Sequence, residues 1–96
     1  MNKTTLYEDV VRCSYKEIFD GVSVSYVLTK ETLHDRASYS ISAEIPSLNE
    51  YATAKDITSD SATADTIFEA VSDGIVTPCC LCEIVEDLIE SILWEQ

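Results

Sequence analysis

The sequence predicts an α+β fold, in which an antiparallel meander of three to four strands precedes two C-terminal helices packed on one face of the sheet. In the first half, apolar and polar side chains alternate with a period of two, which is typical of half-buried strands. In the second half, apolar side chains recur every three to four positions, as in amphipathic helices. With 96 residues and 46% hydrophobic content, the chain is expected to form a single domain, 1–96, with a sheet half near 10–57 and an acidic two-helix half near 60–94.

The first strand is predicted over Val10–Phe19, with Val11, Cys13 and Tyr15 on the face that enters the core. The dipeptide Asp20-Gly21 follows it and predicts a type I′ hairpin turn, because glycine tolerates the positive φ that this turn requires. The second strand begins directly after this turn. Its apolar face is made of Val22, Val24, Tyr26 and Leu28.

The third strand has the clearest pattern, with strict alternation over Ala37–Ile45. A polar loop that contains His34 and Asp35 is expected before this strand, and Pro46 is expected to end it. A weaker fourth strand is predicted over about Glu50–Ile57. The other face of the sheet is rich in serine and is expected to face water. It holds Ser23, Ser25, Ser38, Ser40 and Ser42.

Both helices have recognisable start signals. Ser59, Asp60 and Ser61 offer N-cap oxygens for the first helix, and Gly74 is predicted to end it at the C′ position. Thr77-Pro78 is predicted to start the second helix, with threonine as the cap and proline in the first turn. The apolar stripes are Ala64, Ile67, Phe68 and Val71 in the first helix and Leu81, Ile84, Val85, Leu88 and Ile92 in the second.

The charge of the chain limits its partners. A net charge of −12 argues against direct binding to nucleic acid, which needs lysine and arginine to neutralise phosphates, and an anionic membrane surface repels such a chain. The segment Met1–Val11 lacks the apolar stretch of a signal peptide, and no apolar run is long enough to span a bilayer. The expected location is therefore cytoplasmic, with reduced cysteines and a basic protein surface as partner.

The acidic side chains are concentrated in the helical half. Residues 1–58 carry nine acidic and six basic side chains, whereas residues 59–96 carry nine acidic and no basic ones. Helical geometry turns most of these acids away from the apolar stripes and places Trp94 near them. Trp94 is interpreted either as an aromatic anchor of an interface or as a terminal residue that folds back on the sheet. The predicted partner-binding residues are Asp65, Glu69, Asp73, Glu83, Glu86, Asp87, Glu90 and Trp94.

We therefore expect a non-catalytic protein-interaction module whose acidic helical face docks on a basic surface of a partner, as an inhibitor or regulator. One form of this hypothesis is mimicry of nucleic-acid charge against a nucleic-acid-binding protein or a nuclease, as anti-CRISPR proteins do. A solvated face that only keeps the protein soluble is the simpler interpretation of the same acids.

Two further functions stay open. A thiol-reactive or metal-binding protein is one, because backbone amides at a helix N-terminus favour thiolates. The thiols concerned are Cys79, Cys80 and Cys82. A zinc site needs four ligands, so Cys13 and His34 would have to converge on this cluster. A structural homodimer or larger homo-oligomer through Ile89 and Leu93 is the other.

No catalytic residue, metal or cofactor is predicted. His34 is the only histidine and lies in a polar loop, where a Ser or Cys nucleophile is not expected beside it. No carboxylate is expected in an apolar pocket, as a general acid requires. Gly21 and Gly74 are the only glycines, so no glycine-rich phosphate loop is present.

Three stretches carry a resemblance to a known family. They are Tyr39–Glu44, Asp56–Asp60, and Val76-Thr77-Pro78 leading to Leu81 and Ile84–Leu88. Over the C-terminal two-thirds, the chain resembles a family of short proteins of unknown function from clostridial-type Firmicutes. The resemblance implies a bacterial, cytosolic origin and brings no assigned activity. The cysteines of Cys79–Cys82 are not part of it.

Overall fold

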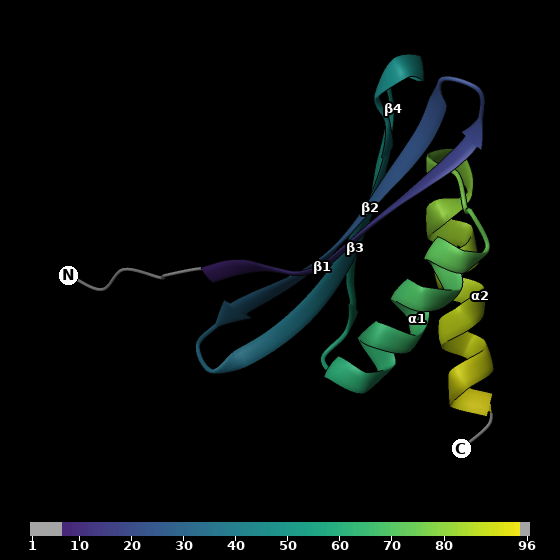
Figure 1. The fold of residues 1–96 in the computed structure, drawn as a ribbon. Helices are drawn as coiled ribbons and strands as arrows, with labels where there is room; N and C mark the ends of the chain where they lie inside the picture. The colour runs from purple at the N-terminus through teal and green to yellow at the C-terminus, as the bar shows by residue number, and fades with distance from the viewer. Residues whose placement is uncertain (1–6, 95–96) are drawn as a thin grey trace.

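The computed structural model describes the backbone of residues 7–94 and the side chains of residues 8–92. Its elements are β1 (Tyr7–Phe19), β2 (Val22–Leu33), β3 (Arg36–Ile45), the 3-10 turn η1 (Pro46–Leu48), β4 (Glu50–Thr58), α1 (Ser61–Asp73), the 3-10 turn η2 (Pro78–Cys80) and α2 (Leu81–Trp94). The strands form one antiparallel sheet in the order β1-β2-β3-β4, and both helices lie on the same face of this twisted sheet (Figure 1). The predicted α+β meander with two C-terminal helices is thus the observed fold.

The core lies between the two middle strands and the helices. Most of the predicted apolar residues of β2 and β3 are buried there, whereas Val22 and Ala37 are half-buried. Ser40, which was expected to face water on the serine-rich face, is also buried, at 5% exposure, so that expectation was wrong for this residue. From the helices, the core receives Ala64, Ile67, Phe68, Val71, Leu81 and Val85, while Ile84, Leu88 and Ile92 are half-buried. Tyr26 is fully buried, and its hydroxyl donates a hydrogen bond to the carbonyl oxygen of Val76 at 2.6 Å. Burial raises the pKa of Tyr26 to about 12.

The faces of β1 are the reverse of the prediction. Arg12 pairs with Leu28 and Ser14 pairs with Tyr26, and paired residues on neighbouring strands share a face of the sheet. Because the side chains of Leu28 and Tyr26 lie beneath the helices, β1 turns its polar residues toward the helices. The apolar residues between Val10 and Tyr15 therefore point to the face without helices, which we call the bare face, whereas Ile18 packs partly against the core. That face carries Val10, Val11, Cys13 and Tyr15, all of which are exposed, so the prediction that Cys13 is a core residue was wrong.

The two hairpin turns also differ from expectation. A type I′ turn needs a positive φ at both central residues, but in the Asp20-Gly21 turn only Gly21 has one, at 77°. A register shift between Glu17 and Phe19 accompanies this turn. The tight turn with two positive φ angles lies instead between β2 and β3, at His34 and Asp35 (φ 51° and 65°), where a polar loop was expected.

The helix ends confirm one cap and revise two. The side chain of Asp60 accepts a hydrogen bond from the backbone amide of Thr63 at 2.8 Å, as an N-cap does. Gly74 keeps a right-handed conformation at the C-cap, and Ile75 takes the left-handed position after it, with φ 51°. Thr77 makes no side-chain capping bond, and Pro78 begins the 3-10 turn η2 that precedes α2.

Candidate functional site

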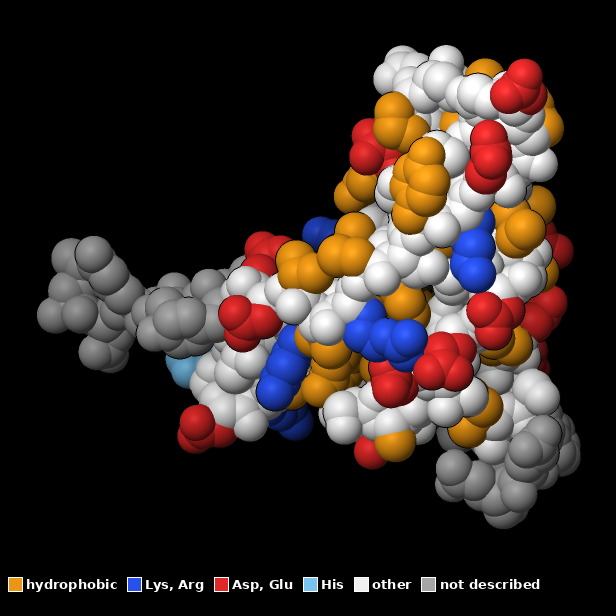
Figure 2. Space-filling view, in the orientation of Figure 1, with side chains coloured by type: hydrophobic (Ala, Val, Ile, Leu, Met, Phe, Trp, Pro, Cys, Tyr) orange, Lys and Arg blue, Asp and Glu red, His pale blue; other side chains and the backbone are white. Residues whose placement is uncertain are grey.

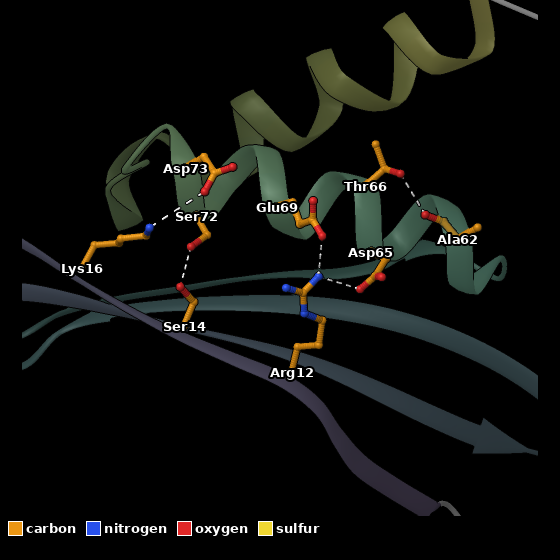
Figure 3. Close-up of polar contacts among 9 residues, drawn as sticks. All are labelled: Arg12, Ser14, Lys16, Ala62, Asp65, Thr66, Glu69, Ser72 and Asp73. Carbon is orange, nitrogen blue, oxygen red and sulfur yellow. Dashed lines mark hydrogen bonds and ion pairs between the residues drawn. The ribbon is translucent and has the colours of Figure 1, made fainter.

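The acids of α1 lie against cations of β1. Arg12 Nη1 is 2.9 Å from Asp65 Oδ1 and 3.0 Å from Glu69 Oε2, and Lys16 Nζ is 3.8 Å from Asp73 Oδ1. The three acids recur every four residues along α1, so they form one row that faces the two cations of the strand (Figure 3). This row of five charged side chains is the α1–β1 charge row. Its acids have counter-ions within the chain, which the composition of the helical half does not reveal.

Arg12 is held from two sides. Its guanidinium carbon lies 5.1 Å from the centroid of the Phe68 ring, within the range of a cation–π contact. Its hydrogen bonds with Asp65 and then with Glu69 raise the pKa of Arg12, because they favour the charged form. Between the two cations of β1, the hydroxyls of Ser14 and Ser72 are hydrogen-bonded to each other. These contacts explain why β1 turns Arg12, Ser14 and Lys16 toward the helices.

The acids of α2 have different surroundings. Glu83, Glu86, Asp87 and Glu90 are all exposed, while Leu81 and Val85 on the other side of the helix are buried. Among the described side chains, none of these four acids forms an ion pair with a cation. Spacings of three and four residues place them on one face of α2, where like charges repel. We call this set the α2 acidic face.

The eight predicted partner-binding residues therefore fall into three groups. The first group is the acids of the α1–β1 charge row, Asp65, Glu69 and Asp73. The second group is the four carboxylates of the α2 acidic face, which form no ion pair with a cation among the described side chains. The side chain of Trp94 lies outside the described residues, so its predicted role as an anchor has no structural account. Sequence reasoning missed Arg12 and Lys16, because they lie more than 50 residues before their partners and no local pattern joins the two segments.

Residues 8–91 match a family of unknown function, DUF6514. The chain belongs to this family. The DUF6514 match begins in β1 and ends in α2, so it includes both the α1–β1 charge row and the α2 acidic face. No curated protein and no solved structure matches the chain.

The cysteines of this DUF6514 chain are free and exposed. The Sγ atoms of Cys79 and Cys80 are 3.8 Å apart, Thr77 Oγ1 is 3.3 Å from Cys79 Sγ, and the thiol of Cys82 donates to the carbonyl oxygen of Thr53 at 3.7 Å. Within the described part of the chain, no group of three or more His, Cys, Asp or Glu residues is placed to hold a metal ion. The convergence of Cys13 and His34 on the cluster, which a zinc site would need, is therefore not observed.

A hollow of about 830 Å³ is lined by the end of β2, the start of β3 and the end of β4. Charged side chains of both signs line it, among them Arg36, Lys55 and Asp56. It contains neither a histidine nor a cysteine, so it does not supply a nucleophile with an imidazole base. Of the helices that the structure describes, none has the length and apolar character to cross a bilayer.

Proposed function

We propose that this chain is a non-catalytic protein-interaction module that docks the α2 acidic face on a basic surface of a partner protein, as an inhibitor or regulator. The supporting observation is the contrast between the two helices. The acids of α1 lie beside Arg12 and Lys16, whereas the four exposed acids of α2 have no cation beside them among the described residues. A basic partner would relieve the repulsion along α2.

Charge of this kind acts mainly on recognition and on the rate of encounter. A row of like charges raises the local concentration of an oppositely charged partner and accelerates association, and salt weakens both effects. A row of carboxylates on one helix also resembles the regular charge of a nucleic-acid backbone. We propose a nucleic-acid-binding protein or nuclease as the partner class, in the cytoplasm of a clostridial-type bacterium.

The test compares two variants with the same change in net charge. The first reverses the α2 acidic face with Glu83→Lys, Glu86→Lys, Asp87→Lys and Glu90→Lys. The matched control reverses four acids that are exposed on the sheet and its turns, with Glu8→Lys, Asp20→Lys, Glu44→Lys and Glu50→Lys. Proteins captured by the wild type from its native host would be identified by mass spectrometry, and their affinities measured by calorimetry.

We expect the α2 variant to bind the identified partner on the order of a hundredfold more weakly, because each reversal replaces an attraction with a repulsion. The control variant should keep most of the affinity, and the wild-type affinity should fall as salt is raised. Equal affinities of wild type and α2 variant, with both proteins folded by circular dichroism, would reject the proposed function.

The exposed thiols support a second candidate. The Sγ atoms of Cys79 and Cys80 are 3.8 Å apart, and both thiols are exposed to reagents in solution. Titration with a thiol-reactive chromophore at neutral pH would detect unusually fast thiols, and Cys13 provides the internal reference as an exposed cysteine in a strand. Equal rates for all four thiols would remove this candidate.

A further inference from the structure

The outer edge of β1 is an unused strand edge. β1 is the first strand of the sheet, and in the described part of the chain no other strand pairs with its outer side. Between the register shifts at Val11 and Ile18, the residues Arg12–Glu17 pair with β2 without interruption, so the edge is regular there. An edge of this kind presents backbone donors and acceptors to a further strand.

The two flanks of this edge differ in chemistry. On the bare face, Val10, Val11 and Tyr15 are 63%, 46% and 69% exposed. On the helix face lies the α1–β1 charge row, in which the acids Asp65, Glu69 and Asp73 keep 52%, 60% and 79% of their side chains exposed. Figure 2 shows this side of the molecule, with hydrophobic side chains along the upper-left border of its main body and, below them, Lys and Arg side chains beside Asp and Glu.

A strand added to this edge must match both flanks. Alternation sends every second side chain to the bare face and the others to the helix face. The added strand therefore needs apolar residues at one set of positions and basic or small polar residues at the other. β1 itself has this pattern, because Val11, Cys13 and Tyr15 alternate with Arg12, Ser14 and Lys16.

We propose that β1 pairs antiparallel with β1 of a second copy of this chain, which joins two four-stranded sheets into one continuous sheet. The pairing would bring the exposed apolar residues of the two bare faces together and place Arg12 and Lys16 of each copy near the α1 acids of the other. The net charge of −12 opposes association of two copies. The opposition is weak at this edge, because the charge row has two cations for three acids, while the α2 acidic face holds four uncompensated carboxylates on another side.

Bulges and charges that point inward on an edge strand commonly block strand addition. Here the positive charges of Arg12 and Lys16 are neutralised by ion pairs with acids of α1. The bulges lie outside the regular stretch Arg12–Glu17. An edge protected only for solubility would not need the four large apolar side chains that β1 exposes, which are Val10, Val11, Tyr15 and Phe19. The interface proposed from the sequence, through Ile89 and Leu93, has less support, because Ile89 packs partly against the core and the side chain of Leu93 is not described.

The first test is the oligomeric state. Sedimentation equilibrium of the wild type should give twice the chain mass of 10.7 kDa. Tyr15→Lys places a charge in the apolar part of the interface and should weaken the dimer at least about tenfold. The matched control is Tyr51→Lys, because Tyr51 is 66% exposed on the bare face but belongs to β4, the other edge strand. That control should remain a dimer.

The second test is chemical cross-linking through Cys13. Pairing centred on Cys13 places Arg12 opposite Ser14 of the second copy and brings the two Cys13 Cα atoms to about 5 Å on the same face. This distance is within reach of a short bismaleimide, to which each thiol adds without an oxidant. A variant that keeps only Cys13, with serine at the other three cysteines, should form a covalent dimer. A variant that keeps only Cys82, which lies on α2, should not.

Each result separates this inference from the proposed function. The α2 charge-reversal variant should stay dimeric, because its substitutions lie away from β1. A wild type that is monomeric at about 200 μM, a concentration at which even weak dimers of micromolar affinity are populated, would overturn the inference. A dimer that Tyr15→Lys leaves intact, or that cross-links through Cys82 and not through Cys13, would also overturn it.

Discussion

The Tyr26→Phe substitution removes one hydroxyl from a buried side chain and leaves the ring in place. The side chain of Tyr26 has no exposed surface, and its hydroxyl donates to the carbonyl oxygen of Val76, which links β2 to the segment between the helices. Without this donor the carbonyl loses a partner in a poorly solvated position. We expect the free energy of unfolding to fall by about 1–2 kcal/mol at pH 7.

The pH dependence makes this prediction sharper. Burial raises the pKa of Tyr26 to about 12 in the folded chain, whereas an unfolded tyrosine titrates near pH ~10. The stabilisation is therefore complete below pH ~10 and is lost as pH rises toward the folded pKa, at about 1.4 kcal/mol per pH unit. The phenylalanine variant lacks this loss, so its stability should equal that of the wild type near pH ~11.

Urea denaturation followed by circular dichroism would measure both effects, at pH 7 and at steps between pH 9 and 11.5. Tyr15→Phe is the control, because Tyr15 is 69% exposed. Its difference from the wild type should stay small at every pH. A gap between wild type and Tyr26→Phe that stays constant from pH 9 to pH 11 would show that the Tyr26 hydroxyl is not held protonated by burial.

Two further substitutions test the charge row and the end of α1. Arg12→Gln should lower the urea midpoint at low salt and should lower it less at 1 M NaCl, because the ion pairs with Asp65 and Glu69 are partly exposed and salt screens them. The control is Lys30→Gln, because Lys30 forms none of the ion pairs of the described residues, and its effect on the urea midpoint should not depend on salt in this way. The same salt dependence in both variants would contradict the structure. Ile75→Gly should raise the free energy of unfolding by about 1 kcal/mol, because a β-branched residue is strained at a φ of 51° and glycine is not. A thermal midpoint below that of the wild type would show that Ile75 is not strained at this position.

Periodicity was a good guide where one face of an element was clearly more apolar than the other. The third strand and the first helix fulfil this condition, and both were predicted with the correct buried face. In β1 the residues Val11, Cys13 and Tyr15 are the more apolar set, yet they are exposed. The sequence pattern alone predicts that the apolar set faces the helices. In the structure, the register with β2 and the ion pairs with the acids of α1 turn the set with Arg12 and Lys16 toward the helices instead.

Turn chemistry shows the same limit on a smaller scale. Asp20-Gly21 has the stronger turn composition, but the adjacent register shift between Glu17 and Phe19 gives it a geometry with one positive φ. The pair His34-Asp35 lacks glycine and still takes two left-handed conformations, because β2 and β3 pair without interruption up to Leu33 and Arg36 and leave two residues for the turn. Strand pairing thus decided the turn type.

The sequence by itself determined the α+β class, the order of the elements, the buried stripe of α1 and the concentration of acids in the helical half. These properties depend on local periodicity and on composition, which need no knowledge of contacts. Only the tertiary structure decided which acids have counter-ions and which face of β1 is buried. The physical reason is distance along the chain, because Arg12 meets Asp65 and Glu69 across 53 and 57 residues, and that contact exists only after the helix has packed on the sheet.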